Sequence, residues 1–551
     1  MSEGEVKQRV LVCVAWPYAN GELHLGHVAG AYLPADIFAR YMRLKGCDVL
    51  MVSGSDAHGT PILVRAEAEG LEPQSIVDRY SAKFDELWNV LDISFDIFTS
   101  TATENHRNVV QSFIATLDKN GYIYQKETEQ YFDPIAHRFL PDRYVEGQCP
   151  HCKYQDARGD QCENCGRTLD PTDLISPISK ISGSEPVLRT SQHAFFRLSN
   201  IENALLEWVR PKIGWRNHVK KWTEGFVGSG LHDRAISRDL DWGVPVPEWL
   251  GLNANKRVYV WFEAVMGYLS ATIEYADKNG LDWHDWWVSP DTASYYFVGK
   301  DNIPFHTVIW PAMLIAHQGL NLPTNVPANN YVLLGGKKAS KSAGLGKPAV
   351  DYAKAFGTDA LRYGLATLLP EADDTELTED LLVERVNTEL ANGWGNLVSR
   401  TFALAVGQLD GRTPNPSQLS SAEDSNLMAV VDSALVESAK AFESVEIRRA
   451  LRIMLTAVQD TNAYLSDAAP WTLRKHDAQA AAQVVSNVLC ALTGLALGLS
   501  PFLPASSRKV LDALGIAGAL AWERPALVTD IELQPIKPLF VKLDGESIAA
   551  R

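Results

Sequence analysis

The feature that most constrains the fold of this chain is a buried strand near its start, followed by a helix and a second buried strand. Residues 10–15 (VLVCVA) form a continuous apolar run rich in β-branched side chains, which is typical of a strand covered on both faces. A Pro/Asn/Gly loop follows at 17–21, then a helical pattern over about 24–45, and then a second apolar run at 48–53. Pro34 lies inside the helical pattern and should kink or divide it. Such a unit predicts the start of a doubly wound parallel sheet.

The pattern of apolar, Pro and Gly residues changes twice beyond this unit. From about residue 119 to 234, short Tyr- and Phe-rich runs alternate with Pro and Gly, which indicates an inserted module. Apolar runs that are typical of the parallel sheet return at 257–262, 294–298 and 331–334. From about 388 to 507, long amphipathic stretches without strand signals predict a helical bundle.

Composition limits the class of protein. The chain has 551 residues, 46% of them hydrophobic and 21% charged, which is ordinary for a globular protein with several cores. Its net charge of −16 argues against a protein that binds DNA over a broad basic surface, although a local basic strip could still bind RNA. The start carries no signal-peptide pattern, so we expect a cytoplasmic protein. The charge-free stretch 484–503 contains polar residues, Gly and Pro, so we predict a buried core helix and no membrane partner.

Four of the seven cysteines form two C-x-x-C pairs: Cys149, Cys152, Cys162 and Cys165. Two such pairs are typical of tetrahedral Zn²⁺, whereas disulfides are disfavoured in a reducing compartment and strained at this spacing. Four thiolates leave no open coordination position. We therefore predict one structural Zn²⁺ in the inserted module.

Two short motifs are candidates for chemistry in the parallel-sheet region. After the first strand, HLGH at 24–27 opens a helix, whose unpaired N–H groups and positive dipole end suit a phosphate. Gly26 leaves room for a nucleotide to approach closely. Taken alone, two such histidines would more simply cap the helix.

The second motif, KASKS at 338–342, follows the run 331–334 and two glycines. It predicts a mobile loop with two cations, although such a loop on its own is usually just solvated. We expect HLGH to follow the first strand and KASKS the last strand of one doubly wound sheet. Both motifs should then open onto the same crevice.

Together the two motifs resemble the HIGH and KMSKS signatures of class I aminoacyl-tRNA synthetases. The resemblance to the methionyl-tRNA synthetase family runs from about Val10 to Trp471, and less specifically to the end. The blocks GKDNIPFH and WFEAVMGY are similar to those of an archaeal-like branch of that family. The blocks that match in order and spacing are AWPYANG at 15–21, DAHGT at 56–60, YVWF at 259–262, GKDN at 299–302 with His306 and Trp310, and APW at 469–471.

The resemblance implies a two-step reaction. L-methionine reacts with ATP, accompanied by Mg²⁺, to give methionyl-adenylate and pyrophosphate. Methionine then passes to the 3′ end of initiator and elongator tRNA(Met). Attack of a carboxylate on the α-phosphate depends mainly on positioning and charge stabilisation. By resemblance, Lys341 steadies the transition state. The implied catalytic residues are His24, His27, Lys338 and Lys341, and the implied ATP-binding residues are His24, Gly26, His27, Lys338, Ser340, Lys341 and Ser342.

The methionine site implied by the resemblance is apolar and aromatic, which suits a thioether. The Asp56 carboxylate could hold the substrate ammonium or cap the next helix, and the family match favours the ammonium. Trp16, Val265, Asn302 and Ala339 differ from the residues that many members carry, so we expect a pocket of distinct shape. The implied methionine-binding residues are Ala15, Tyr18, Asp56, Trp261, Ala264, Tyr268 and His306.

In the helical region the resemblance implies an anticodon site at Asn396, Arg400 and Trp471. Asn396 and Arg400 share one face of a helix because they are four residues apart. Single-stranded RNA is bound by stacking on aromatic rings and by hydrogen bonds to base edges. The competing interpretation is that Trp471 is buried in the bundle core.

We therefore expect an α/β protein: a class I Rossmann-type nucleotide-binding catalytic domain with an inserted zinc-binding connective domain, followed by an α-helical bundle. A further dimerisation domain found in some members is not evident, so we expect a monomer. The expected boundaries are 1–118 for the first catalytic half with HLGH, 119–234 for the connective insertion, 235–330 for the second half, 331–387 for the KASKS-bearing linker module, and 388–551 for the anticodon-binding helices and tail.

Three alternatives remain at this point. A class I synthetase for isoleucine, valine or leucine would carry a much larger insertion than 119–234, and a cysteine-specific one would bind zinc in its active site. A nucleotidylyltransferase with an H-x-G-H motif would need neither the helical region nor KASKS. A catalytically inactive tRNA-binding relative would have no need of HLGH, Asp56 and Lys341 together.

Overall fold

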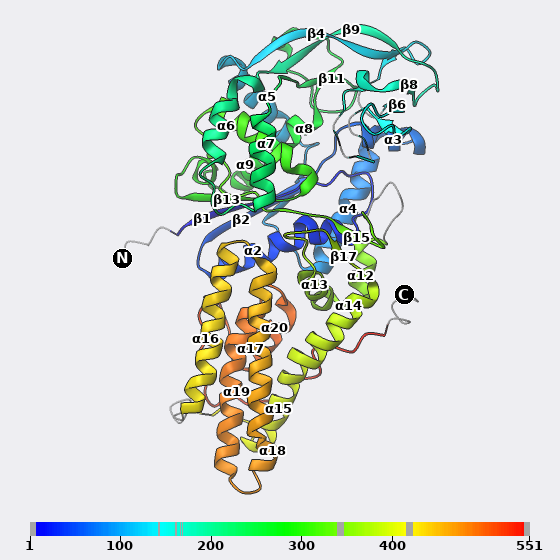
Figure 1. The fold of residues 1–551 in the computed structure, drawn as a ribbon. Coiled ribbons are helices and arrows are strands. Elements are labelled where there is room, and N and C mark those ends of the chain that lie inside the picture. Colours follow the sequence, from blue (N-terminus) through cyan, green and yellow to red (C-terminus); the bar gives the residue numbers. More distant parts are fainter. Residues whose placement is uncertain are drawn as a thin grey trace.

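The computed structural model describes residues 7–140, 144–159, 162, 164–165, 167, 169–338, 347–414 and 422–544, with only the backbone for 337–338 and 422–424. Its parts are stacked along one long axis (Figure 1). Antiparallel sheets lie at one end, a parallel sheet with covering helices lies in the middle, and a helical bundle extends to the other end.

The parallel sheet has the strand order β14-β13-β1-β2-β3, and each neighbouring pair is parallel. The expected doubly wound sheet is thereby confirmed, with the first strand of the chain at its centre. Alternate residues of that strand face opposite cores: Val10, Val12 and Val14 one core, Leu11 and Cys13 the other. The strands are β1 (Arg9–Val14), β2 (Asp48–Ser55), β3 (Ile97–Ser100), β13 (Thr292–Gly299) and β14 (Ala328–Asn329).

The helix that follows β1 has three consecutive segments: α1 (Leu25–His27), the π-helical η1 (Val28–Tyr32) and α2 (Leu33–Leu44). Pro34 is the second residue of α2 and follows the π-helical segment, and the helical backbone continues through it. The helix is thus divided in type at Pro34, one of the two predicted outcomes, but it is not interrupted.

Helices cover both faces of the sheet. On the face shared with Val12 lie α2, α3 (Thr60–Glu69) and α4 (Pro73–Leu91). On the other face lie α5 (Glu104–Lys119), α9 (Gly267–Asn279) and α11 (Trp310–His317).

The inserted region contains two antiparallel sheets. The larger has the order β10-β9-β4-β5 and is built on the long pairing of β4 (Ile123–Asp133) with β9 (Val187–Phe196). The smaller has the order β7-β6-β8, and its strand β6 (Val145–Gln148) leads directly into Cys149. The other strands and α-helices are β5 (Arg138–Phe139), β7 (Ala157–Arg158), β8 (Ile175–Ser179), β10 (Arg234–Ala235), α6 (Glu202–Val209) and α7 (Asn217–Gly228).

Two of the runs predicted as strands of the parallel sheet lie outside that sheet. The run 257–262 does not join the parallel sheet: β12 (Lys256–Val258) pairs antiparallel with β11 (Ser237–Asp239), and the chain then turns into α8 (Val260–Glu263). A short apolar run does not distinguish a buried strand from a buried helical turn, and here the tertiary packing selects the helix.

The run 331–334 is a strand, but of another sheet. β15 (Val332–Leu334) lies in a small sheet of order β16-β15-β17, with β16 (Lys337–Lys338) and β17 (Thr375–Glu376). The KASKS segment therefore does not follow the last strand of the parallel sheet. Gly335 and Gly336 both have positive φ and form the tight turn between β15 and β16.

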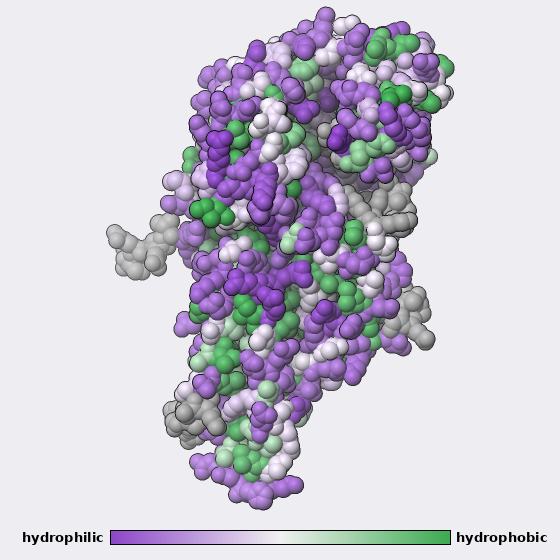
Figure 2. Space-filling model, viewed as in Figure 1, coloured by the Kyte–Doolittle hydropathy of each residue, from purple (hydrophilic) through white to green (hydrophobic). Residues whose placement is uncertain are grey.

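The C-terminal part is a helical bundle, as predicted. The longest charge-poor helix, α19 (Ala478–Leu499), is apolar enough to span a membrane by length and composition, the only such helix among the described residues. However, 78% of its apolar window is buried among neighbouring helices, as expected for a core helix. On the face shown in Figure 2, apolar residues of the bundle lie in small groups between hydrophilic ones. The other bundle helices are α15 (Asn396–Gln408), α16 (Ala422–Glu443), α17 (Ile447–Ala468), α18 (Pro470–Leu473) and α20 (Pro504–Ala513).

The bundle shares one hydrophobic core with the parallel sheet. That core continues from α2 and α4 through α12 (Ala349–Phe356) and α13 (Thr358–Thr367) into the bundle. At the junction, Tyr41 of α2 stacks on Phe442 of α16 with ring centroids 4.4 Å apart. A long helix formed by α14 (Glu379–Arg385), the π-helical η9 (Val386–Gly395) and α15 runs from the small sheet toward the far end of the bundle (Figure 1).

Candidate active site

A pocket of about 70 Å³ opens where the carboxyl ends of β1, β2 and β13 meet. All seven residues implied for methionine binding line it, although they come from segments nearly 300 residues apart. Four further residues complete the wall. Three of these had been noted only as departures from the family, and Phe305 was missed although it directly precedes His306. The lining residues are Ala15, Trp16, Tyr18, Asp56, Trp261, Ala264, Val265, Tyr268, Asn302, Phe305 and His306.

The apolar wall is held by hydrogen bonds between its own polar atoms. His306 Nδ1 donates to the Asn302 carbonyl at 2.9 Å, which leaves Nε2 to accept from the Tyr268 hydroxyl at 2.7 Å. Burial lowers the pKa of His306 to about 4, so its ring is neutral near pH 7. Trp261 Nε1 donates to the Tyr18 hydroxyl. The wall therefore presents aromatic rings in fixed orientations, and a thioether makes favourable contacts with such rings.

Asp56 is the acidic residue of the pocket, and it is 3% exposed. Its backbone N–H donates to the Pro17 carbonyl at 2.8 Å, which ties the β2 end to the loop after β1. Its Oδ1 accepts from the His58 N–H at 3.2 Å. Burial, and next the nearby Glu263 carboxylate, raise the pKa of Asp56 well above its ordinary value. A cationic group in the pocket would favour the ionised carboxylate.

Beside Asp56 lies a buried cluster that was missed in the sequence. Glu263 has no exposed surface, and its two oxygens contact His58 Nδ1 at 2.7 Å and His106 Nε2 at 2.5 Å. His106 Nδ1 lies 2.8 Å from the Ser270 hydroxyl. Although burial alone would raise the pKa of Glu263, the two imidazoles lower it to about 2. The one available signal was that His58 lies in the DAHGT block and Glu263 follows YVWF.

Trp16 is seated against two glycines. A Cβ added to Gly54 would overlap its ring, and one added to Gly267 would lie 2.7 Å from it. The indole also lies edge-on to Tyr268, with ring centroids 6.4 Å apart. These small residues are therefore needed to keep the large indole at the pocket wall rather than inside the pocket.

The start of α12, the described helix after KASKS, lies beside the HLGH motif. His24 caps the start of α1 and His27 is its last residue, with ring centroids 3.7 Å apart and Gly26 between them. α12 begins just beyond the KASKS segment, and its Ala349 N–H donates to the carbonyl of Leu23 at 2.8 Å. Lys338 ends β16, without a described side chain, while Ser340, Lys341 and Ser342 lie outside the described residues.

The four cysteines of the two C-x-x-C pairs come together, with all Sγ atoms within 4.8 Å of one another. Cys149 and Cys165 have sulfurs 4.0 Å apart, and Cys152 and Cys162 3.5 Å apart. Four sulfurs at about 2.3 Å from one tetrahedral ion would be about 3.8 Å apart. The cluster thus has the size to hold one metal ion.

The three residues implied for anticodon binding lie together toward the far end of the bundle. Trp471 is 43% exposed, so it is not a core residue, and the competing interpretation is wrong on this point. The Arg400 guanidinium lies over the Trp471 ring, 5.1 Å from its centroid. Asn396, one turn before Arg400 on α15, is also exposed.

Fold and site together define a class. A parallel sheet divided by an insertion, with HLGH after its first strand and a helical domain behind it, is expected of a class I aminoacyl-tRNA synthetase. The family model described as "tRNA synthetases class I (M)" matches residues 10–402. A second model, "Anticodon binding domain of methionyl tRNA ligase", matches residues 413–538.

Individual relatives narrow the class. A methionine–tRNA ligase of Dehalococcoides mccartyi is 45% identical over 548 residues, which cover 98% of each chain. One of Roseiflexus castenholzii is 42% identical, covering 98% of this chain and 97% of the relative. The crystal structure of Mycobacterium tuberculosis methionyl-tRNA synthetase bound by methionyl-adenylate superposes with a TM-score of 0.80 at 28% identity, over 97% of this chain and all of that one. The chain belongs to the methionyl-tRNA synthetase family.

Proposed function

We propose that this chain ligates methionine to tRNA in two steps, through methionyl-adenylate, with the residues described above in named roles. The observation that carries the proposal is the pocket. Seven side chains implied for methionine binding, drawn from four parts of the chain, line one cavity at the carboxyl edge of the parallel sheet. That edge is where doubly wound sheets bind their ligands.

In the first step Asp56 holds the substrate ammonium. The support is its burial and its raised pKa, since a cation in this pocket would compensate a carboxylate that is otherwise costly to ionise. The neutral His306 and the hydroxyl of Tyr268 already satisfy one another, so this wall offers the thioether rings without a buried charge.

His24, Gly26 and His27 receive the triphosphate with its Mg²⁺, at the start of the helix after β1, where the positive end of the helix dipole favours an anion. Lys338, Ser340, Lys341 and Ser342 complete the ATP site from the other side. The bond from Ala349 to Leu23 supports this arrangement, because it anchors the chain beyond KASKS beside HLGH.

In the second step tRNA(Met), initiator and elongator alike, is held at Asn396, Arg400 and Trp471. An exposed ring with a guanidinium over it offers a stacking surface to an unpaired base. The four-cysteine cluster holds one structural Zn²⁺, which would fix the two C-x-x-C turns of the insertion and supply no catalytic step. We expect the protein to act in the cytoplasm.

Amino-acid-dependent exchange of pyrophosphate into ATP tests the proposal. Methionine should be the only standard amino acid that supports robust exchange. Lys341→Ala should slow adenylate formation about 10²- to 10³-fold while methionine binding is little changed. Exchange with leucine, isoleucine or valine and none with methionine would refute the proposal.

A further inference from the structure

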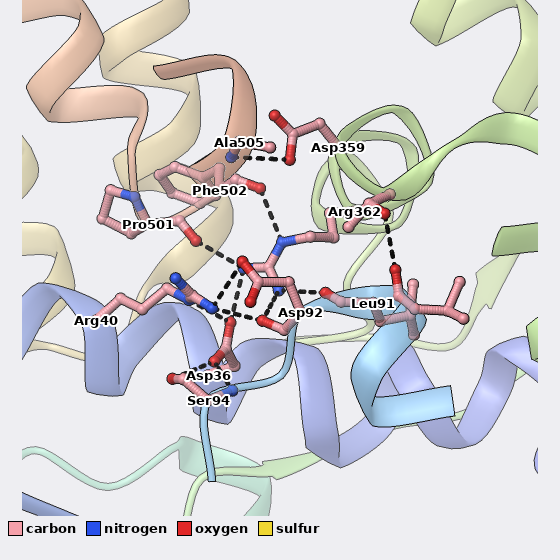
Figure 3. Close-up of polar contacts among 12 residues, drawn as sticks. Asp36, Arg40, Leu91, Asp92, Ser94, Asp359, Arg362, Pro501, Phe502 and Ala505 are labelled. Atoms are coloured by element: carbon pink, nitrogen blue, oxygen red, sulfur yellow. Dashed lines mark hydrogen bonds and ion pairs between the residues drawn. The ribbon is translucent and has the colours of Figure 1, made fainter. Parts of the chain in front are cut away.

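Arg362 of α13 has no exposed surface, yet every N–H of its guanidinium has an acceptor (Figure 3). Nε donates to the Phe502 carbonyl at 3.1 Å, and Nη1 to the carbonyls of Leu91 and Asp92 at 3.0 and 3.3 Å. Nη2 donates to the Pro501 carbonyl at 2.8 Å and pairs with Asp36 Oδ2 at 2.7 Å. One side chain thus binds three segments that are far apart in sequence.

The carboxylate on the other side of this pair is equally enclosed. Asp36 has no exposed surface, and Oδ2 also accepts from Arg40 Nε at 2.8 Å. Its Oδ1 accepts from the N–H and the hydroxyl of Ser94 at 2.7 and 2.6 Å. Both oxygens are therefore occupied, and Asp36 has one defined position in which it can meet Arg362.

A second residue of α13 binds the same end of the bundle. Asp359, one turn before Arg362, accepts from the N–H groups of Ser506 at 2.6 Å and Ala505 at 3.3 Å, in the first turn of α20. Arg362 thus binds the short turn between α19 and α20, and Asp359 binds the start of α20. We call this turn, residues 500–503, the α19–α20 turn.

Two of these segments, and α13 itself, lead to parts of the sites proposed above. Asp36 lies nine residues beyond His27 on the continuous helix that begins with HLGH, or about 14 Å along its axis. From the α19–α20 turn, the 22 residues of α19 run about 33 Å toward α18, which carries Trp471. α13 itself follows the KASKS segment after a single helix, α12.

The bundle and the parallel-sheet region would stay packed together without Arg362. The apolar core is continuous across it, and Tyr41 and Phe442 stack between α2 and the bundle. Apolar packing tolerates small sliding movements, whereas a planar guanidinium with five directed N–H groups accepts one mutual orientation of its partners. A buried ion pair is also a weak source of net stability, and is better suited to specifying an arrangement.

We propose that Arg362, held by Asp36, is a positioning residue for the transfer step. It sets the orientation of the bundle relative to the HLGH helix, so that a tRNA held near Trp471 presents its 3′ end at the pocket. This inference rests on the functions proposed for the pocket and for the site around Trp471.

The test is Arg362→Lys, which keeps the positive charge opposite Asp36 but loses the guanidinium N–H groups that bind the α19–α20 turn. Methionine-dependent pyrophosphate exchange should stay within about twofold of the unchanged protein, since the pocket is intact. kcat/KM for charging a full-length tRNA(Met) transcript should fall about tenfold or more, mainly through kcat. Asp36→Asn should give the same split, and a melting curve of each variant sets an assay temperature at which it is folded.

A double-mutant cycle with Trp471→Ala separates positioning from plain destabilisation. If Arg362 couples the two ends, Trp471→Ala should cost much less charging activity in the Arg362→Lys background than in the unchanged protein. Arg524→Lys is the matched control. Its ion pair, at 2.6 Å, joins the segment after α20 to Asp432 of α16 and does not involve Asp36 or Arg362, so it should leave the ratio of charging to exchange unchanged.

Two results would overturn the inference. The first is that Arg362→Lys lowers the rates of charging and of exchange by the same factor. The second is that the fold losses in charging caused by Arg362→Lys and by Trp471→Ala simply multiply in the double variant. Failure of the anticodon proposal gives a different result: Trp471→Ala alone leaves charging normal. In that case the ratio of charging to exchange in Arg362→Lys and Asp36→Asn still decides the role of Arg362.

Discussion

Glu263 and His106 lie 2.5 Å apart in the interior, and neither side chain has any exposed surface. His58 contacts the other oxygen of Glu263 at 2.7 Å, and its backbone N–H donates to Asp56. Two buried carboxylates therefore lie close together here. Glu263, behind the pocket, contacts two imidazoles, whereas Asp56, which lines the pocket, is the carboxylate that we propose to pair with the substrate ammonium.

Glu263→Gln should lower the melting temperature at pH 7, because it leaves two buried imidazoles without their carboxylate. Breaking such a buried pair typically costs about 3–5 kcal/mol. Since the pKa of Glu263 is lowered to about 2, its contribution is complete above its ordinary pKa and is lost as the pH falls toward 2. The difference in melting temperature between variant and unchanged protein should therefore narrow at acid pH. An equal difference at pH 7 and pH 3 would contradict this account.

Methionine binding should release a proton at Asp56. The raised pKa means that the empty pocket favours the protonated carboxyl, and the substrate ammonium favours the ionised one. The dissociation constant of methionine should then fall as the pH rises through the raised pKa of Asp56. Calorimetry in buffers of different ionisation enthalpy measures the proton directly.

Asp56→Asn is the matched variant for that experiment. It should abolish the proton release and weaken methionine binding by about 10- to 100-fold, the usual value of a hydrogen bond to a charged group. A buffer-independent heat in the unchanged protein would show that Asp56 is already ionised before methionine binds.

Trp16→Leu should enlarge the pocket and relax its selectivity. The indole occupies the space that Gly54 and Gly267 leave open, so a smaller side chain frees volume beside the methionine site. Analogues longer than methionine by one methylene should gain about 10- to 200-fold in exchange kcat/KM relative to methionine. Gly267→Ala is the opposite control, since its Cβ would push the indole toward the substrate and weaken methionine binding. If the ratio of analogue to methionine activity is unchanged in both variants, Trp16 does not determine the specificity of the pocket.

Trp471→Ala should impair charging without impairing the first step. Because the ring is 43% exposed, its loss leaves little cavity, and the melting temperature should change little. Loss of one base–aromatic stack is worth about 1–3 kcal/mol, which would appear in kcat/KM for tRNA. Pyrophosphate exchange should remain as in the unchanged protein. A parallel drop in exchange, charging and melting temperature would instead indicate a structural role.

The purified protein should contain about one equivalent of zinc, as a closed four-thiolate site predicts. Cys162→Ser should lose most of the metal and expose the insertion to proteolysis. Cys47→Ser, a cysteine outside the cluster, should change neither. A metal-free and fully active protein with four reactive thiols would exclude the site.

Local patterns in the sequence were sufficient for much of this protein. The apolar run at β1, the glycine and two histidines of HLGH, and the two C-x-x-C pairs are each confined to a few neighbouring residues, so they can be recognised from the sequence alone. The run 257–262 shows the limit, because the same aromatic residues suit a buried strand or a buried helix, and only their neighbours select the helix.

Only the tertiary structure could bring together residues that share no local pattern. Glu263 meets His58 and His106 from three different elements, and Arg362 meets carbonyls more than 130 residues away on either side. Exposure likewise depends on neighbours: the turn that begins with Pro470 could be buried or open, and the packing of α18 on α19 leaves the Trp471 ring in solvent. Hydrophobic periodicity specifies which residues leave water, whereas the pairing of buried polar groups depends on directed contacts that exist only after the elements have packed.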